Sequence, residues 1–99
     1  MKIIKSPSEL KKNLDKKENI FLIPTMGNLH KGHLSLIKEA KKLSKNIVLT
    51  IFINPIQFNS ENDLNSYPRT LSQDINLLNG KGISVLFIPS VKDIYPKKP

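Results

Sequence analysis

Short apolar runs alternate with amphipathic stretches along the chain of 99 residues. The apolar runs predict four β-strands, at 2–5, 20–23, 46–53 and 83–88. Because the run at 20–23 is unbroken, it is typical of a strand that is covered on both faces. Between the strands, apolar residues recur every three or four positions, which predicts helices that begin near 7, 31 and 70. This alternation favours an α/β fold, a parallel sheet with right-handed crossovers and helices on both faces.

Capping residues support two of the predicted helix starts. The first predicted helix begins with a serine cap at Ser6, a proline at its first position (Pro7) and an acid three residues after the cap (Glu9). The segment 70–73 repeats the capping-box pattern with threonine and glutamine. The first and the last of the three helices therefore have defined beginnings.

Two loops are the expected place for a functional site. Parallel sheets bind ligands beyond the carboxyl ends of their strands, in loops that lead into helices. The first such loop covers 24–30 and precedes the second helix. The second begins at Asn54 and Pro55, where the proline ends the strand, and continues through a polar stretch at 57–69 that has room for one helical turn. Both histidines and the carboxamides of Asn54 and Gln57 lie in or beside these loops.

The composition excludes several classes of protein. The chain has no cysteine, which rules out disulfide scaffolds, zinc fingers and thiol catalysis. No apolar run approaches the roughly 20 residues that cross a bilayer, and the first residues do not resemble a signal peptide. We therefore expect a cytoplasmic protein without membrane contact.

The charge of the chain is strongly positive, with 16 basic and 8 acidic residues giving +8. Such a field attracts polyanions, including nucleoside triphosphates. However, Arg69 is the only arginine, and the paired lysines have no aromatic residues between them. Base recognition favours arginine and single-strand binding requires aromatic platforms, so we predict a solvated lysine surface and no nucleic-acid partner.

The loop at 24–33 carries both histidines, three residues apart at the mouth of a helix. A helix N-terminus binds phosphate through its free N–H groups and its partial positive charge. Gly27 permits a tight turn, and we expect Gly32 to let a flat ring or a phosphate approach the backbone between the imidazoles of His30 and His33. An unperturbed pKa near 6.5 also suits proton donation to a leaving group.

A metal site and a structural role for the histidine pair also stay open at this point. Histidines at i and i+3 can bind a metal, although no Asp, Glu or Cys lies close in sequence to complete a ligand set. Histidines at a helix start are also common as surface or capping residues. The residues alone therefore permit phosphate binding, metal binding or a structural role.

The segment from Thr25 to His33 resembles the His-x-Gly-His signature of the nucleotidylyl-transferases, in which a substrate attacks the α-phosphate of a nucleotide. The longer string from Pro24 is similar to one family among them, the pantoate–β-alanine ligases. The similarity extends over most of the chain in four ordered blocks, at 24–33, 51–58, 67–70 and 89–96. It implies a Rossmann-like nucleotide-binding domain over residues 1–99.

The resemblance implies a two-step reaction in which ATP brings Mg²⁺ mainly on its own phosphates. The carboxylate of pantoate attacks the α-phosphate and gives pantoyl adenylate and pyrophosphate. The amine of β-alanine then attacks the acyl group and releases pantothenate and AMP. The implied ATP loop is Met26, Gly27, Asn28, Leu29, His30, Lys31, Gly32 and His33. Of these, His30 and His33 are the implied catalytic pair, with His33 as proton donor to pyrophosphate.

The second loop is implied to hold the remaining substrates. Gln57 would bind pantoate and later lie near β-alanine, Asn54 would support the same pocket, and Met26 would face it from the first loop. A carboxamide can both donate to a carboxylate and accept from a hydroxyl. Without the resemblance, plain turn chemistry after Pro55 is the favoured role of these two carboxamides.

The resemblance also implies that the segment 67–70 borders the site and a subunit contact. We expect Tyr67 to wall the pocket and Arg69 to pair with a carboxylate at the start of the next helix. The remaining aromatic expectations concern core side chains, namely Phe21, Phe52 and Phe87.

Members of the resembled family are far longer than this chain and add a second nucleotide-binding segment and a phosphate-clamping loop. We therefore expect the N-terminal portion of a larger two-domain enzyme that forms a homodimer, with weak nucleotide binding and little turnover by these residues alone. Two alternatives stay open. One is a non-catalytic module that binds nucleotides or polyanions, and the other is a different nucleotidylyltransferase with the same signature.

Overall fold

The computed structural model describes residues 1–97 and contains one parallel sheet. The sheet order is β1-β4-β3-β2, and each neighbouring pair runs parallel. Its strands are β1 (Lys2–Ile4), β2 (Ile20–Thr25), β3 (Asn46–Ile51) and β4 (Val85–Phe87). The α/β fold with a parallel sheet is confirmed. Strand β4 is shorter than the predicted run at 83–88, since each of its neighbours, β1 and β3, pairs with only three of its residues.

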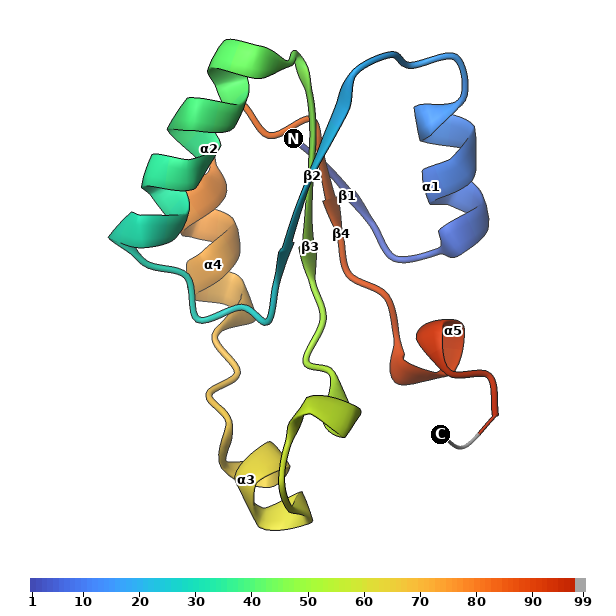
Figure 1. The fold of residues 1–99 in the computed structure, drawn as a ribbon, viewed down its shortest axis with the longest axis vertical. Coiled ribbons are helices and arrows are strands. Elements are labelled where there is room, and N and C mark those ends of the chain that lie inside the picture. The colour runs from blue at the N-terminus through green and yellow to red at the C-terminus, as the bar shows by residue number, and fades with distance from the viewer. Residues whose placement is uncertain (98–99) are drawn as a thin grey trace.

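Helices cover both faces of the sheet, as predicted. Helix α1 packs on one face, while α2 and α4 lie side by side on the other (Figure 1). Three short elements, including α3 and α5, lie beyond the carboxyl ends of the strands (Figure 1). The helices are α1 (Pro7–Leu14), α2 (Lys31–Leu43), α3 (Glu61–Ser66), α4 (Leu71–Leu78) and α5 (Val91–Ile94), with a 3₁₀ turn at Pro55–Gln57. None of these helices is long and apolar enough to span a bilayer.

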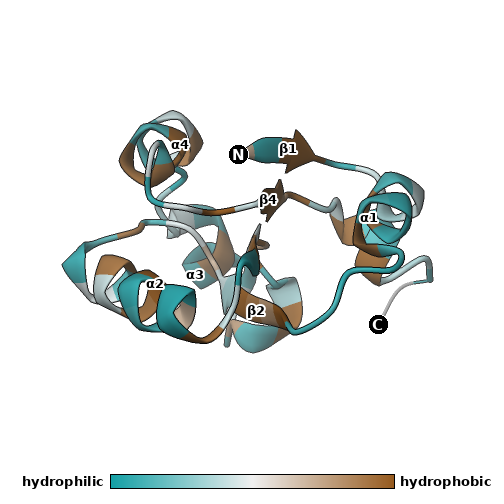
Figure 2. Ribbon diagram, turned by 90° about the horizontal axis from the view of Figure 1, so that it is seen from above, coloured by the Kyte–Doolittle hydropathy of each residue, from teal (hydrophilic) through white to brown (hydrophobic). Residues whose placement is uncertain are grey.

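The buried apolar side chains form one cluster on each side of the sheet. Figure 2 shows the apolar strand β4 between the layer of α1 and the layer of α2 and α4. The larger cluster joins β2, β3 and β4 to the two helices on their side, with Ile37, Leu49, Leu78 and Leu86 at its centre. Burial of this kind contributes about 25 cal/mol per Å² of apolar surface, and it fixes the sheet on which the loops are mounted.

The prediction that 20–23 is covered on both faces is wrong. Strand β2 lies at the edge of the sheet, and Ile20 and Leu22 are 40% and 58% exposed. Leu22 is in register with Val48, which packs in the smaller cluster under α1. That helix covers β1, β4 and β3 but does not reach across to β2. One face of β2 is therefore open, whereas Ile23 on the other face is buried.

The two predicted caps differ in outcome. The Ser6 side chain accepts a hydrogen bond from the Glu9 amide, so the first cap is confirmed. Thr70 accepts no such capping hydrogen bond, and its hydroxyl donates to the carboxylate of Asp74 at 3.1 Å. The capping box predicted at 70–73 is therefore wrong, and the hydroxyl serves a contact with a buried acid.

Candidate functional site

The loops after β2 and β3 meet at the carboxyl edge of the sheet. The Phe52 amide donates to the Thr25 carbonyl at 3.0 Å, and the Thr25 hydroxyl donates to the Thr50 carbonyl at 2.9 Å. These contacts continue the pairing of the two strands to the point where the chains diverge. Met26 and Phe52, one from each loop, line both of the cavities that open here.

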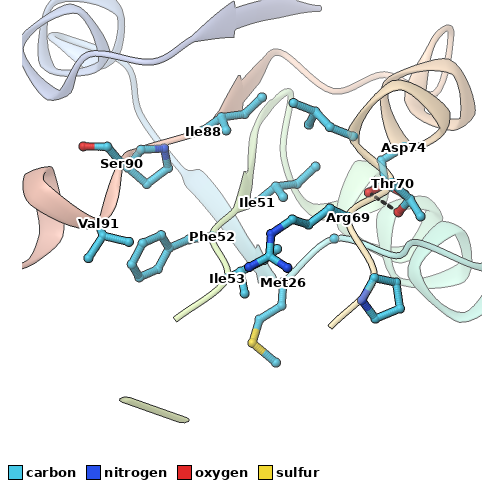
Figure 3. A pocket seen from close by; sticks show the side chains of 14 residues that line it. Met26, Ile51, Phe52, Ile53, Arg69, Thr70, Asp74, Ile88, Ser90 and Val91 are labelled. Atoms are coloured by element: carbon cyan, nitrogen blue, oxygen red, sulfur yellow. Dashed lines mark hydrogen bonds between the residues drawn. The ribbon is translucent and has the colours of Figure 1, made fainter. Parts of the chain in front are cut away.

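The first cavity, of about 390 Å³, lies beyond the ends of β3 and β4. Figure 3 shows an apolar floor that includes Phe52 and Ile88, with the Arg69 side chain extending across from the segment before α4. Phe52 was predicted as core, but it is half-buried and belongs to the cavity wall. The position after the last paired residue of a strand faces the site rather than the sheet interior.

The expectations for Tyr67 and Arg69 are wrong in this structure. Arg69 donates to the carbonyls of Tyr67 at 3.0 Å and Leu64 at 3.4 Å, and it makes no ion pair among the described residues. Tyr67 packs edge-on against Phe58 with ring centroids 5.4 Å apart and lines neither cavity. The Arg69 guanidinium therefore stabilises the segment that precedes α4, and its side chain lines the first cavity.

The second cavity, of about 420 Å³, brings together the residues predicted for substrate binding. Asn54 and Gln57 line it together with Met26. Asn54 also begins the 3₁₀ turn, since its Oδ1 accepts from the Ile56 amide at 3.2 Å. Asn54 therefore makes the contact expected from turn chemistry while also lining the cavity.

The orientation of the Asn54 amide follows from its partners. A backbone N–H can only donate, so the atom that faces Ile56 must be the oxygen. The Tyr95 hydroxyl donates to the same Oδ1 at 3.0 Å. The Asn54 Nδ2 group has no acceptor among residues 1–97, so its N–H donors are free.

The two histidines cap α2 through their Nδ1 atoms. The His30 Nδ1 accepts from the Gly32 amide at 3.0 Å, and the His33 Nδ1 accepts from the His30 amide at 3.1 Å. A nitrogen that accepts carries no proton, so both neutral imidazoles hold their proton on Nε2. Each ring therefore has a donor on the side away from its capping contact.

The predicted space between the imidazoles is absent. The ring centroids are 4.3 Å apart, which leaves no room for an anion between them. A Cβ on Gly32 would lie 2.8 Å from Cε1 of His30, and the Gly32 amide already serves as a cap donor. The glycine accommodates the His30 ring, so the expectation that it admits a phosphate between the rings is wrong. An anion would instead meet the Nε2 atoms from outside.

The histidines and the two cavities lie next to one another at the carboxyl edge of the sheet, but they do not form a single pocket. Neither His30 nor His33 lines either cavity, whereas Met26 of the same loop lines both and Gly27 lines the first. Among residues 1–97 the His, Asp and Glu side chains nowhere gather in a group of three that could hold a metal ion.

Burial lowers the pKa of His33 below its ordinary value of 6.5, and the neighbouring charge of His30 lowers it further, while Asp74 opposes both. The folded state therefore binds a proton here less readily than the unfolded chain, so lowering the pH through the window just below 6.5 removes stability.

We predict that an NMR titration of the His33 imidazole gives a midpoint below 6.5 and an Nε2–H tautomer above it. The unfolding free energy should decline as pH falls through that window, and less steeply in His33→Asn, which lacks the titrating group. A midpoint above 6.5, or equal slopes in the two proteins, would contradict the prediction.

Sequence reasoning missed Asp74, the charged residue most closely tied to the loop. Its carboxylate is 3% exposed and accepts from the amides of Asn28 and Leu29 and from the Thr70 hydroxyl. The available signal was an acid on the apolar stripe of α4, three residues after Leu71 and four before Leu78. An acid in such a position requires donors from elsewhere in the fold.

Comparison with known proteins supports the same family over nearly the whole chain. The family model "Pantoate-beta-alanine ligase" matches residues 2–98. The chain is 47% identical over 97 residues to the pantothenate synthetase of Idiomarina loihiensis, and it spans about a third of that protein's length. It is 48% identical over 93 residues to the pantothenate synthetase of Francisella tularensis subsp. novicida, of which it covers 36%.

Solved structures agree with the sequence comparison. A crystal structure of pantothenate synthetase from Thermus thermophilus superposes with a TM-score of 0.90 at 38% identity, over 98% of this chain and 35% of that one. The pantoate–β-alanine ligase from Francisella tularensis, complexed with beta-gamma ATP and β-alanine, gives 0.89 at 45% identity and covers 98% and 38%. By the family model, the sequence relatives and the fold, this chain belongs to the pantoate–β-alanine ligase family.

Proposed function

We propose that these residues form the part of an ATP-dependent ligase that binds ATP and pantoate for condensation with β-alanine. One observation carries the proposal. The donors of a histidine pair and the carboxamides of a cavity lie along one sheet edge, and Met26, from the loop that carries the histidines, lines that cavity. A phosphate group and a carboxylate must approach each other for adenylation, and this edge offers neighbouring donors for both.

The first part of the proposal concerns the nucleotide. Met26 to His33 hold ATP, with Nε2–H of His30 and His33 donating to phosphate oxygens from the rim of the sheet. Lys31 is exposed beside them and adds a positive charge. Neutral imidazole donors strengthen their hydrogen bonds as negative charge develops on the departing pyrophosphate. Because the pKa of His33 is lowered, the neutral donor is favoured over an imidazolium acid at neutral pH.

The second part concerns the carboxylic acid substrate. Asn54 offers Nδ2–H donors into the cavity because its oxygen is already bound twice. Gln57 lies on the same wall and can donate to a carboxylate or accept from a hydroxyl. Pantoate carries both groups, so the two carboxamides match its polar end while Met26 and Phe52 match its methyl groups.

The reaction that follows from this placement is an in-line displacement. The pantoate carboxylate attacks the α-phosphate, the bond to the β-phosphate breaks, and pyrophosphate leaves with its electron pair. The β-alanine amine then attacks the acyl carbon of pantoyl adenylate, and AMP leaves. Positioning and charge stabilisation suffice for both steps, so no covalent enzyme intermediate is required.

Magnesium fits this proposal as a companion of the nucleotide. The residues described offer no group of three ligating side chains, and both oxygens of Asp74 accept hydrogen bonds. The ion would be bound mainly by ATP phosphates, where it neutralises their charge. Homodimer formation and a cytoplasmic location complete the proposal for the whole enzyme.

The proposed function is tested by pyrophosphate release in a full-length ligase whose corresponding segment is this sequence. Release should require ATP and pantoate together, and β-alanine should be needed only for AMP and pantothenate. A matched reaction with a pantoate analogue lacking the carboxylate serves as control. Release that is independent of pantoate would exclude the ligase function and favour another nucleotidylyltransferase or a hydrolase.

A further inference from the structure

Asp74 on α4 is the one buried charged side chain among residues 1–97, with 3% of its surface exposed. The ion pair found in this part of the chain joins Lys42 to Glu39, so no cation neutralises the Asp74 carboxylate. Burying an ionised carboxylate is costly unless hydrogen-bond donors replace its water. The donors that surround it therefore reveal what the side chain holds in place.

Two of its three donors come from the loop that leads into α2. The Leu29 amide donates to Oδ1 at 2.9 Å, and the Asn28 amide donates to Oδ2 at 3.0 Å. The third donor is the Thr70 hydroxyl, 3.1 Å from Oδ2, visible as a dashed contact in Figure 3. One carboxylate thus joins the loop after β2 to the residue that precedes α4.

The backbone conformation of residues 27–29 is not one that this loop would adopt by itself. Gly27 and Asn28 are consecutive residues with left-handed backbone, at φ 79° and 53°. For Asn28 this conformation is unfavourable in an isolated chain. Successive amides in such a turn converge on one point and form a concave site for an anion. The anion here is Asp74, supplied 45 and 46 residues further along the sequence.

The contact between Asp74 and Leu29 also affects the histidines. Leu29 directly precedes His30, whose amide and ring make the capping contacts that orient both imidazoles. We infer that Asp74 is a positioning residue whose carboxylate sets the path of 27–29 and thereby aims the Nε2 atoms of His30 and His33. Its effect on turnover rests on the proposed function, whereas its hold on the loop does not.

The loop-holding role is tested in the 99-residue chain with Asp74→Asn. Asparagine keeps the shape but has only one acceptor atom for two amides. Hydrogen exchange at Asn28 and Leu29 should accelerate at least about tenfold, since a bond to a charged acceptor is lost. The control is Ile75→Val on the same helix, whose apolar side chain packs against the core cluster and makes no hydrogen bond to the Asn28 and Leu29 amides. Equal exchange in the two variants would overturn the inference.

The positioning role is tested in the full-length ligase with the same two variants. Asp74→Asn should lower kcat for pyrophosphate release at least about tenfold more than Ile75→Val, with KM for pantoate within about twofold, because the pantoate cavity keeps its carboxamides. Equal kcat values would overturn the positioning role. If the unmodified ligase releases no pyrophosphate, the proposed function fails while the exchange result still decides the loop contact.

The unmodified chain provides a test that does not depend on the folding of a variant. The Lys31 amide has no acceptor among residues 1–97, while the Asn28 and Leu29 amides face the carboxylate. Their exchange should be at least about tenfold slower than that of Lys31 after correction for intrinsic rates. Similar rates at the three amides would show that Asp74 does not hold the loop.

Discussion

A full-length ligase that carries His33→Ala is expected to release pyrophosphate at least about a hundredfold more slowly than the unmodified enzyme. The variant loses the Nε2–H donor that we propose meets the phosphates, and such donors contribute most where charge accumulates in the transition state. It also loses the Nδ1 acceptor that caps the His30 amide at 3.1 Å. Steady-state release of pyrophosphate with saturating pantoate measures the combined effect.

Two further substitutions separate the donor from the cap. In His33→Asn the amide oxygen takes the place of Nδ1 and can accept from the His30 amide, but nothing replaces Nε2. In His33→Gln the amide nitrogen approaches the place of Nε2, whereas the capping acceptor is lost. We expect His33→Asn to be nearly as slow as His33→Ala with a melting temperature closer to that of the unmodified protein.

The glutamine variant should show the opposite combination of properties. Its rate should exceed that of His33→Ala, and its stability should not exceed that of His33→Asn, because losing a helix cap costs about 1 kcal/mol. If His33→Asn keeps the unmodified rate, the imidazole matters only as a cap and its proposed contact with the nucleotide is wrong. Circular dichroism melting of each variant provides the comparison of stability.

Local sequence patterns were sufficient for most of the fold. The strand–helix order and the parallel sheet follow from apolar periodicity, which burial between the sheet and the helices on its two faces enforces. The failure at Leu22 has a physical cause, because strand order is decided by contacts far apart in sequence. The apolar run predicted two covered faces, but β2 lies at the sheet edge beyond the reach of α1.

The sequence pointed to candidate residues but not to their contacts. Loop position and residue type led to His30 and His33, whereas the family resemblance was needed to give Asn54 and Gln57 a role beyond turn chemistry, and the structure places these two carboxamides on one cavity. The hydrogen bonds that orient them involve distant partners such as Tyr95, 41 residues from Asn54. The reason for Gly32 was also misjudged, since a ring of the same motif fills the space expected for a ligand.

The largest expected loss of stability from one added methyl group in this loop is at Gly27. Its φ of 79° is unfavourable for alanine by about 1–2 kcal/mol. Its Cβ would also lie 3.1 Å from Oδ2 of Asp74 and 3.3 Å from Cγ2 of Ile51, both in buried side chains with little freedom to move. Because overpacking adds about 1–3 kcal/mol, Gly27→Ala should cost about 3 kcal/mol in total.

Gly80 provides a matched control for the backbone contribution. Its φ of 75° is nearly the same, and a Cβ there would meet nothing within 4 Å. Urea unfolding should therefore show Gly80→Ala destabilised by about 1–2 kcal/mol and Gly27→Ala by about 2 kcal/mol more. Equal losses would mean that the Asp74 carboxylate and Ile51 yield freely to the methyl group, which a carboxylate held by three donors should not do. The difference between the two alanines thus measures how rigidly the core of the sheet supports the loop that carries the histidines.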